Sequence, residues 1–225
     1  MADIAGKVGL LRIGGYIQTT TIAFVDSNPD TITDSGNGFL LAGFIAGDKI
    51  TVSGSTSNNS TFTIATVVAG TITLSGGDSL TAESAGDLVQ IITAAPGHTT
   101  YGIKNYSINY NAQATDISTY ETVQSDASAP RDFIGTTTGW TLNAGGYYDT
   151  GETSEEDFVG RQRYFYIFIK YVASPSGGDP AYYYHGMGII NGINPDSAVD
   201  TVVNYPITIQ GSGALSALVT KTSAW

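Results

Sequence analysis

The stretch Ser107-Ile108-Asn109-Tyr110-Asn111-Ala112-Gln113-Ala114 alternates strictly between polar and larger or apolar residues. A period of two is typical of a β-strand, because successive side chains point to opposite faces of the sheet. The polar positions carry only amides and a hydroxyl, without the Lys and Glu that usually cover a solvent-facing sheet. The segment Trp140–Ala144 repeats this pattern. Both strands therefore present a neutral polar face. This composition indicates that the face lies against another molecule or surface.

The same alternation runs through most of the chain and is interrupted by turn residues at short intervals, which predicts short antiparallel strands. The fold class we expect is therefore all-β and mainly antiparallel. Further strands are predicted at Val8–Ile13, Tyr164–Tyr171, Tyr182–Ile193 and Tyr205–Gln210. A strand at 164–171 would be apolar on both faces and needs cover on both sides.

One short helix is predicted at Thr153–Arg161. Hydroxyl side chains stand at its N-cap, and three consecutive acids, Glu155, Glu156 and Asp157, lie in its first turn, where the helix dipole favours them. These acids could also form a catalytic pair, but adjacent helical positions point in different directions. We therefore interpret them as capping residues.

The composition divides the chain into two units, because 13 of the 14 Tyr and both Trp lie after residue 100. Residues 1–17 would be a first strand and arm, 18–98 a small β module, and 99–225 the larger domain. Within the module, strands are expected at 21–25, 49–53, 61–67, 71–75 and 89–92. Its expected core consists of alternate apolar positions: Ile22, Phe24, Phe44, Ile50, Val52, Phe62, Ile64, Ile72, Leu74, Val89 and Ile91.

Composition and charge exclude several classes of protein. The 225 residues carry a net charge of −11, so the chain repels polyanions, and a nucleic-acid reader that binds through a basic patch is excluded. Without Cys and with only His98 and His185, thiolate sites are excluded and a zinc site is not expected. No apolar run reaches the ~20 residues that span a bilayer, so we expect no membrane insertion. We expect no enzyme, no catalytic residue, no metal and no cofactor.

The order of features after residue 100 resembles the lambda-like family of major tail tube proteins of long-tailed, non-contractile bacteriophages. The resemblance rests on the strand Tyr106–Gln113, the following Thr115–Thr119, and the strand Gly139–Ala144 that leads through Gly145–Asp149 into the capped helix. It also rests on the ending Ile207–Leu215, and it extends more weakly to the opening strand.

The resemblance implies a β-sandwich or half-barrel with a flanking helix. Six copies would join edge to edge into a homo-hexameric ring, and the rings would stack helically into a tube. The implied partners are the tape measure protein and duplex DNA, both transiently in the lumen, and the tail terminator and tail tip proteins. The implied location is the virion tail, with assembly in the host cytoplasm.

The resemblance also implies roles for individual residues. The lumen-facing candidates are Ser107, Asn109, Asn111, Gln113, Thr141, Asn143, Thr208 and Gln210. A loop over 116–134 would reach the next ring, and its polar candidates are Asp116, Glu121, Asp126, Arg131 and Asp132. The small β module, as a barrel or sandwich inserted at a hairpin tip, would project outward so that the channel stays open.

Two alternatives remain open. The chain could be another structural protein of the virion, such as a capsid decoration protein or a tail terminator. It could also be a glycan-binding adhesion domain, since aromatic side chains can stack on sugars. The candidate platform consists of Trp140, Tyr164, Tyr166, Tyr182 and Tyr184.

Overall fold

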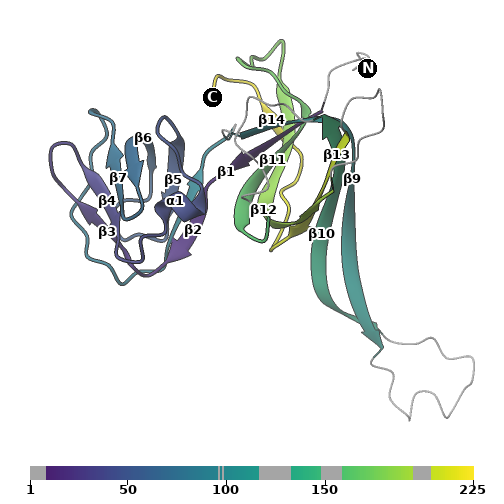
Figure 1. Ribbon diagram of the computed structural model, residues 1–225, viewed down its shortest axis with the longest axis horizontal. Helices are drawn as coiled ribbons and strands as arrows, with labels where there is room; N and C mark the ends of the chain where they lie inside the picture. Colours follow the sequence, from purple (N-terminus) through teal and green to yellow (C-terminus); the bar gives the residue numbers. More distant parts are fainter. Residues whose placement is uncertain (1–8, 96, 98, 117–132, 148–158, 195–203) are drawn as a thin grey trace, which may run out of the picture.

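The computed structural model describes residues 9–95, 97, 99–116, 133–147, 159–194 and 204–225. These residues form two antiparallel sheets of seven strands each, together with one short helix (Figure 1). The prediction of a mainly antiparallel all-β fold is confirmed.

The larger sheet contains the strands that carry the neutral polar face. Six of its strands, β1 and β9 to β13, are called the barrel below. The sheet consists of β1 (Gly9–Gly14), β9 (Thr99–Asp116), β10 (Phe133–Tyr147), β11 (Gln162–Lys170), β12 (Ala181–Ile193), β13 (Asn204–Gly211) and β14 (Val219–Lys221).

The barrel is closed at one end and open at the other. Its strand order is β11-β1-β9-β10-β13-β12, and β12 pairs back with β11. β1 pairs with β9 only from Thr99 to Ile103. Beyond that point, the described residues provide β9 with a partner on its β10 side alone. The result is a curved sheet that matches the expected half-barrel and leaves part of one strand edge unpaired.

Large side chains fill the interior of the barrel, and glycines make room for the largest of them. Trp140 and Leu142 of β10 are buried together with Phe165 and Ile167 of β11. A Cβ atom added to Gly211 would lie 2.2 Å from the Trp140 ring, so only glycine fits beside the indole. The interior is therefore a packed core.

The second face of β11 is covered too, as its apolar pattern requires. Tyr166 and Phe168 point away from the barrel interior and pack with Tyr183 of β12. Ala95 and Trp225 pack against this outer cluster. The predicted strand at 164–171 therefore has cover on both sides, but the outer cover comes from a connector and the C-terminal segment.

Residues 16–93, called the small unit below, form the other sheet. Its strands are β2 (Tyr16–Thr19), β3 (Ile22–Val25), β4 (Thr31–Asp34), β5 (Lys49–Ser53), β6 (Thr61–Val68), β7 (Thr71–Leu74) and β8 (Val89–Thr93). All eleven core positions expected from the sequence are buried in one cluster. That cluster also contains Ile32, Phe39, Ala42 and Leu80.

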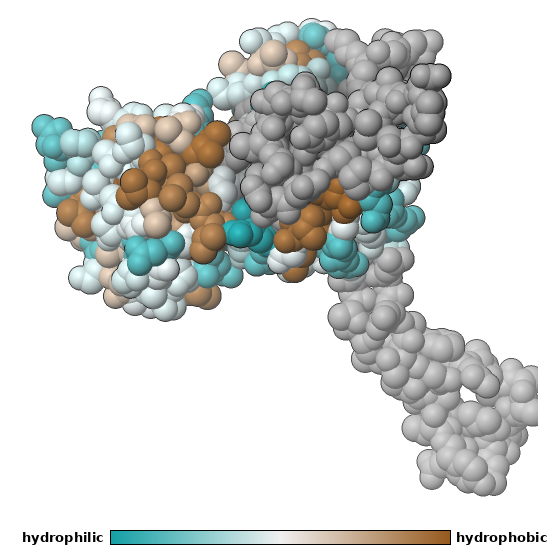
Figure 2. All heavy atoms as spheres, in the orientation of Figure 1, coloured by the Kyte–Doolittle hydropathy of each residue, from teal (hydrophilic) through white to brown (hydrophobic). Residues whose placement is uncertain are grey.

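The helix α1 (Phe39–Ala42) lies in the small unit, and not where the sequence predicted one. Phe39 anchors it in the core, and Gly43 ends it with a left-handed φ of 89°. Leu40 and Leu41 remain 53% and 61% exposed, and Figure 2 shows apolar surface over this part of the small unit.

The helix expected at 153–161 falls largely outside the described residues. Its described end is not helical, because Val159 forms a parallel bridge with Ile190 and Gly160 has a positive φ of 76°. A helix through Arg161 is therefore wrong. Among the described residues no helix is long and apolar enough to cross a membrane.

Candidate functional site

The neutral polar side chains lie in two rows across three neighbouring strands. Antiparallel pairing sets Ser107 of β9 opposite Asn143 of β10, and Asn143 opposite Thr208 of β13. The next row is Asn109, Thr141 and Gln210. Because directly paired residues share a face, six of the eight predicted lumen residues come together on one outer surface of the barrel. This surface is called the amide face below.

The buried residues between these rows explain why the face is ordered. Ile108, Leu142 and Ile209 pair across the same three strands and point into the barrel core. Burial of Leu142 and Ile209 fixes the register, since a slip by one residue would turn the whole apolar set outward. The core therefore holds the polar rows in place.

The amide face is open to solvent and weakly hydrogen-bonded within itself. Ser107, Asn109, Asn143 and Gln210 are exposed, and Thr141 and Thr208 are half-buried. Thr208 Oγ1 donates to Asn143 Oδ1 at 3.2 Å, and Thr141 Oγ1 donates to Gln210 Oε1 at 3.4 Å. A shallow hollow of about 440 Å³ lies along the Ser107 row. Gln210 Nε2 also donates to the Trp140 carbonyl at 3.3 Å, and the exposed side chains of this face are accessible to solvent or to a ligand.

The amide face carries no charge at neutral pH. Its two rows contain only hydroxyl and amide side chains. Tyr106 also lines the hollow. Burial is the main cause that raises the pKa of its hydroxyl, and the neighbouring Tyr184 raises it further, so Tyr106 stays neutral. A surface of this kind offers dipoles but no cation to a polyanion.

The register extends the site beyond the two rows. β9 continues to Asn111, opposite Gly139, and to Gln113, opposite Thr137. The side chains at 111 and 113 lie outside the described part of the chain, so their predicted roles stay predictions. At the other end, exposed Asn105 pairs with Gly145 and adds a residue that the sequence reasoning missed. Its position two residues before Ser107 was the available signal.

On β12 the amide face gives way to small and apolar residues. Thr208 pairs with Gly192, and Gln210 pairs with Ile189, with a register shift between Ile190 and Gly192. This border could not be predicted from the sequence, because it depends on which strand pairs with β13. The amide face is therefore a strip centred on β9, β10 and β13.

β9 and β10 run on together beyond the rest of the barrel. Their pairing continues to Asp116 opposite Phe133, and Figure 1 shows the two strands leaving the barrel as a projecting hairpin. The strand segments 111–116 and 133–139 are called the arm below. Within the described residues, neither outer edge of the arm is paired. The predicted stacking loop would extend from this arm. Asp116 ends β9, while Glu121, Asp126, Arg131 and Asp132 lie outside the described residues.

The open edges lack the charged residues and prolines that protect many exposed strands, and their one irregularity is a register shift between Gly135 and Thr137 of β10. From Asn105 to Thr115, β9 has no charged residue and no Pro, and neither has β10 from Phe133 to Gly139. Exposed edges are normally protected by Lys, Pro or very short strands, because a free edge recruits further strands. These edges are therefore suited to pairing with another chain.

The aromatic residues considered as a sugar platform do not share a surface. Trp140 is 1% exposed inside the barrel, and Tyr184 packs against the same interior cluster. Tyr164 and Tyr166 lie on the opposite face of β11, where the Tyr164 hydroxyl is 2.7 Å from His185 Nδ1. Four of the five aromatic side chains therefore pack on two different sides of the sheet, and they do not form the continuous platform that stacking on a sugar requires.

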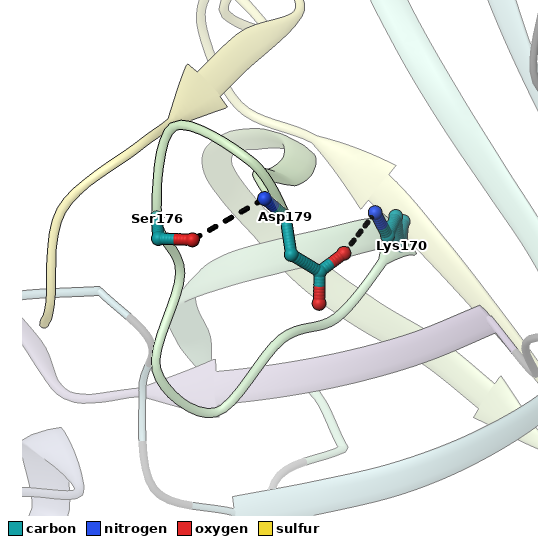
Figure 3. Close-up of polar contacts among 3 residues, drawn as sticks. All are labelled: Lys170, Ser176 and Asp179. Carbon is teal, nitrogen blue, oxygen red and sulfur yellow. Dashed lines mark hydrogen bonds and ion pairs between the residues drawn. The ribbon is translucent and has the colours of Figure 1, made fainter.

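Two strongly bonded carboxylates, those of Asp34 and Asp179, order the turns around them. Asp34 accepts hydrogen bonds from Thr21 Oγ1 and from the backbone N–H groups of Gly36 and Gly38. Asp179 in the β11–β12 loop pairs with Lys170 at 2.5 Å, and its N–H donates to Ser176 Oγ (Figure 3). No group of three or more metal-binding side chains is found among the described residues.

Comparison with known proteins gives a distant and partial likeness. No family model matches the chain, and no curated protein matches it. One solved structure is the tail of an empty GTA particle with C6 symmetry, which matches this chain with a TM-score of 0.39 and 20% sequence identity. The match covers 52% of this chain and 81% of the chain in that structure. A virion of a native gene transfer agent particle has the same TM-score and identity, with coverage of 51% and 83%.

Proposed function

We propose that this protein is the repeating subunit of a bacteriophage-type tail tube. Six copies form a ring, as the family resemblance implies, and the rings stack into a tube with the amide face lining its channel. The tape measure protein and then duplex DNA occupy the channel transiently, and tail terminator and tail tip proteins close its ends. The subunit contributes structure and performs no catalysis.

The amide face is the observation that carries this proposal. A channel for duplex DNA must avoid tight contacts to phosphate, because every cation that neutralises a phosphate adds affinity and slows movement. The two rows offer amides and hydroxyls alone. Combined with the net charge of −11, a channel of this kind lets DNA slide without capture.

The open edges supply the means of assembly. The edge of β9 from Asn105 to Asp116 and the edge of β10 from Phe133 to Gly139 have no partner among the described residues, and they belong to opposite sides of one hairpin. Pairing the first edge of one copy with the second edge of the next is a heterologous contact, which closes into a ring when the rotation allows it. Ring closure then satisfies all these edges at once.

The small unit joins the barrel on the side away from the amide face. Its two connections lead from the end of β1 and into the start of β9, and the adjoining part of the barrel is β1 and β11. The amide face is built from β10 and β13 with the later part of β9. If that face lines the channel, the small unit projects outward as an inserted module.

Sedimentation velocity and negative-stain microscopy at rising protein concentration test the proposal. We expect concentration-dependent growth of hollow filaments of uniform width. Monomers at every concentration, without rings or filaments, would contradict it. Compact closed oligomers without a bore would favour the alternative of a capsid decoration protein.

A further inference from the structure

We propose that the C-terminal segment, residues 212–225, is a strap that locks the small unit onto the barrel in one orientation. Two domains joined by short connectors normally move relative to one another unless a substantial interface prevents it. Several contacts at this junction act against such movement, and the strap closes its outer side. The strap acts within one chain and is independent of tube assembly.

The inner side of the junction is a buried hydrogen-bond network around Thr93, the last residue of β8. The Tyr166 hydroxyl of β11 donates to the Thr93 carbonyl at 2.6 Å. Thr93 Oγ1 accepts from the Gly15 N–H at 2.9 Å and donates to Asp48 Oδ2 at 3.2 Å. Because Thr93 and Tyr166 are 2% and 3% exposed, this network ties the small unit to the outer face of β11 without access for water.

Two arginines extend the junction along the barrel. Arg12 of β1 donates to the Gly97 carbonyl at 3.1 Å, and its guanidinium lies 4.7 Å from the centre of the Tyr171 ring. Arg163 of β11 is 3% exposed and lies under Gly43, where an added Cβ would be 2.9 Å from Nε. The end of α1 therefore rests directly on β11.

The strap is fastened to the barrel along its length. The Ser212 N–H donates to the Met187 carbonyl at 2.8 Å, and the Ser216 N–H donates to the His185 carbonyl at 2.9 Å. β14 then pairs with the start of β12, from Ala181 to Tyr183. These bonds guide the strap along the edge of β12 toward the small unit, and Figure 1 shows its end between the two units.

Trp225, at the end of the strap, contacts both the barrel and the small unit. Its ring packs edge-on against Phe168 and tilted against Tyr183, each at 5.7 Å between ring centres, and its Nε1–H donates to the Val172 carbonyl at 3.0 Å. The Trp225 carbonyl accepts from Lys49 Nζ of the small unit at 3.1 Å. One residue thus contacts both units.

A hollow borders this contact. A space of about 390 Å³ is lined by the turn Ile45–Lys49, by the connector at Ala94 and Ala95, and by Trp225. The turn and the connector are joined to each other, because the Ala94 N–H donates to the Lys49 carbonyl at 2.6 Å. The hydrogen bond from Lys49 to Trp225 therefore links the small unit to the strap at the edge of this hollow.

Distance measurement by pulsed electron paramagnetic resonance tests the lock. Because the chain has no Cys, the double variant Ala65→Cys/Asn191→Cys places one spin label on each unit at exposed positions. The labelled chain is mixed with excess unlabelled protein, so that only distances within one chain contribute. We expect one narrow distance distribution.

Removal of the strap contacts should broaden this distribution. In the labelled background, Trp225→Ala should widen it about twofold or more, because unrestrained domains sample many orientations. Lys49→Ala should widen it less, and Leu218→Ala, an exposed strap residue, should leave it unchanged. If far-UV circular dichroism shows that Trp225→Ala does not fold, Lys49→Ala decides alone. A broad distribution in the parent, or a width unchanged in the deciding variant, would overturn the proposal.

Discussion

At the scale of single residues, the barrel depends on the fit between one indole and the glycines around it. Trp140 lies against Gly211 and also within 3.3 Å of a Cβ added to Gly186. These two glycines belong to β13 and β12, so three strands are matched to one side chain. The core beneath the amide face therefore has little tolerance for added volume.

Gly211→Ala should destabilise the protein. The new methyl group would overlap the Trp140 ring, and overpacking of a core costs about 1–3 kcal/mol. We expect a lower midpoint in chemical denaturation. Gly178→Ala is the matched control, because nothing lies within 4 Å of its added Cβ. Equal midpoints for the two variants would show that the indole can move aside.

Acidification should weaken the protein in two separate pH ranges. Burial lowers the pKa of His185 below its usual 6.5, so the unfolded chain binds a proton that the folded chain resists. Burial raises the pKa values of Asp34 and Glu83, but hydrogen bonds outweigh it and hold both below their usual 3.8 and 4.5. The stability that these groups contribute is fully present above pH 6.5. As the pH falls, it declines first because His185 is protonated in the unfolded chain, and then, below about pH 4.5, because the two carboxylates are protonated.

Denaturation at pH 7.5, 5.5 and 3.5 measures this decline. His185→Gln should remove part of the loss between pH 7.5 and 5.5 and leave the loss below pH 4.5 in place. An unchanged free energy of unfolding between pH 7.5 and 5.5 in the parent would mean that His185 is protonated equally in the folded and unfolded chains.

Much of the amide face could be predicted from single residues, and part of it could not. Alternation alone put Ser107 and Asn109 on one face, because the period of a strand is two. That Asn143 and Thr208 lie beside Ser107 depends on the register between strands. Register follows from core packing and turn geometry over long separations, which a single sequence does not display.

At the scale of secondary-structure elements, the strands were predictable and the short exceptions were not. The strand at 49–53 has the predicted bounds, and β9 and β10 contain the predicted segments. β2 and β4 were missed, although β3 and β7 have the same length of four residues and were predicted. α1 was missed because its four residues amount to about one helical turn, which is too short to show the helical period.

Positive charge placed on the amide face should convert a neutral channel into a DNA-binding one. The double variant Asn109→Lys/Asn143→Lys adds cations in neighbouring rows. The affinity of lysines for DNA phosphates falls as the salt concentration rises, and the slope of log affinity against log salt concentration reports the number of phosphate contacts. We expect assembled tubes of this variant to retain linear duplex DNA at low salt and release it at high salt. Tubes of Ala65→Lys/Thr66→Lys, which carry the same charge on the small unit, should allow DNA to pass freely. Equal retention by both variants would mean that the amide face does not line the channel.

Shortening the arm should separate folding from assembly. Tyr110 and Trp140 are directly paired, so an Asn-Gly turn can replace residues 111–139 and close the hairpin at the barrel. We expect a folded monomer with the parent's far-UV circular dichroism and no filaments in negative stain, because both open arm edges are gone. Filaments of normal width from this variant would show that the subunits join elsewhere.

At the scale of the whole molecule, the residues that the structure describes form a barrel that is closed at one end and open along β9. The closed part buries the core, while the amide face and the arm leave hydrogen-bonding groups and strand edges for other molecules. The small unit attaches on the far side of the barrel from the amide face. This arrangement suits a subunit with one side toward a channel and the other toward solvent.

Helical reconstruction of the assembled filament by electron cryo-microscopy measures the central property directly, namely which residues line the bore. We predict a hollow tube in which Asn109, Asn143 and Gln210 of every copy face the axis, β9 of one copy pairs with its neighbour, and the small unit lies on the outside. A filament whose bore is lined by the small unit or by the outer aromatic cluster of β11, with the amide face turned to solvent, would contradict the proposed function.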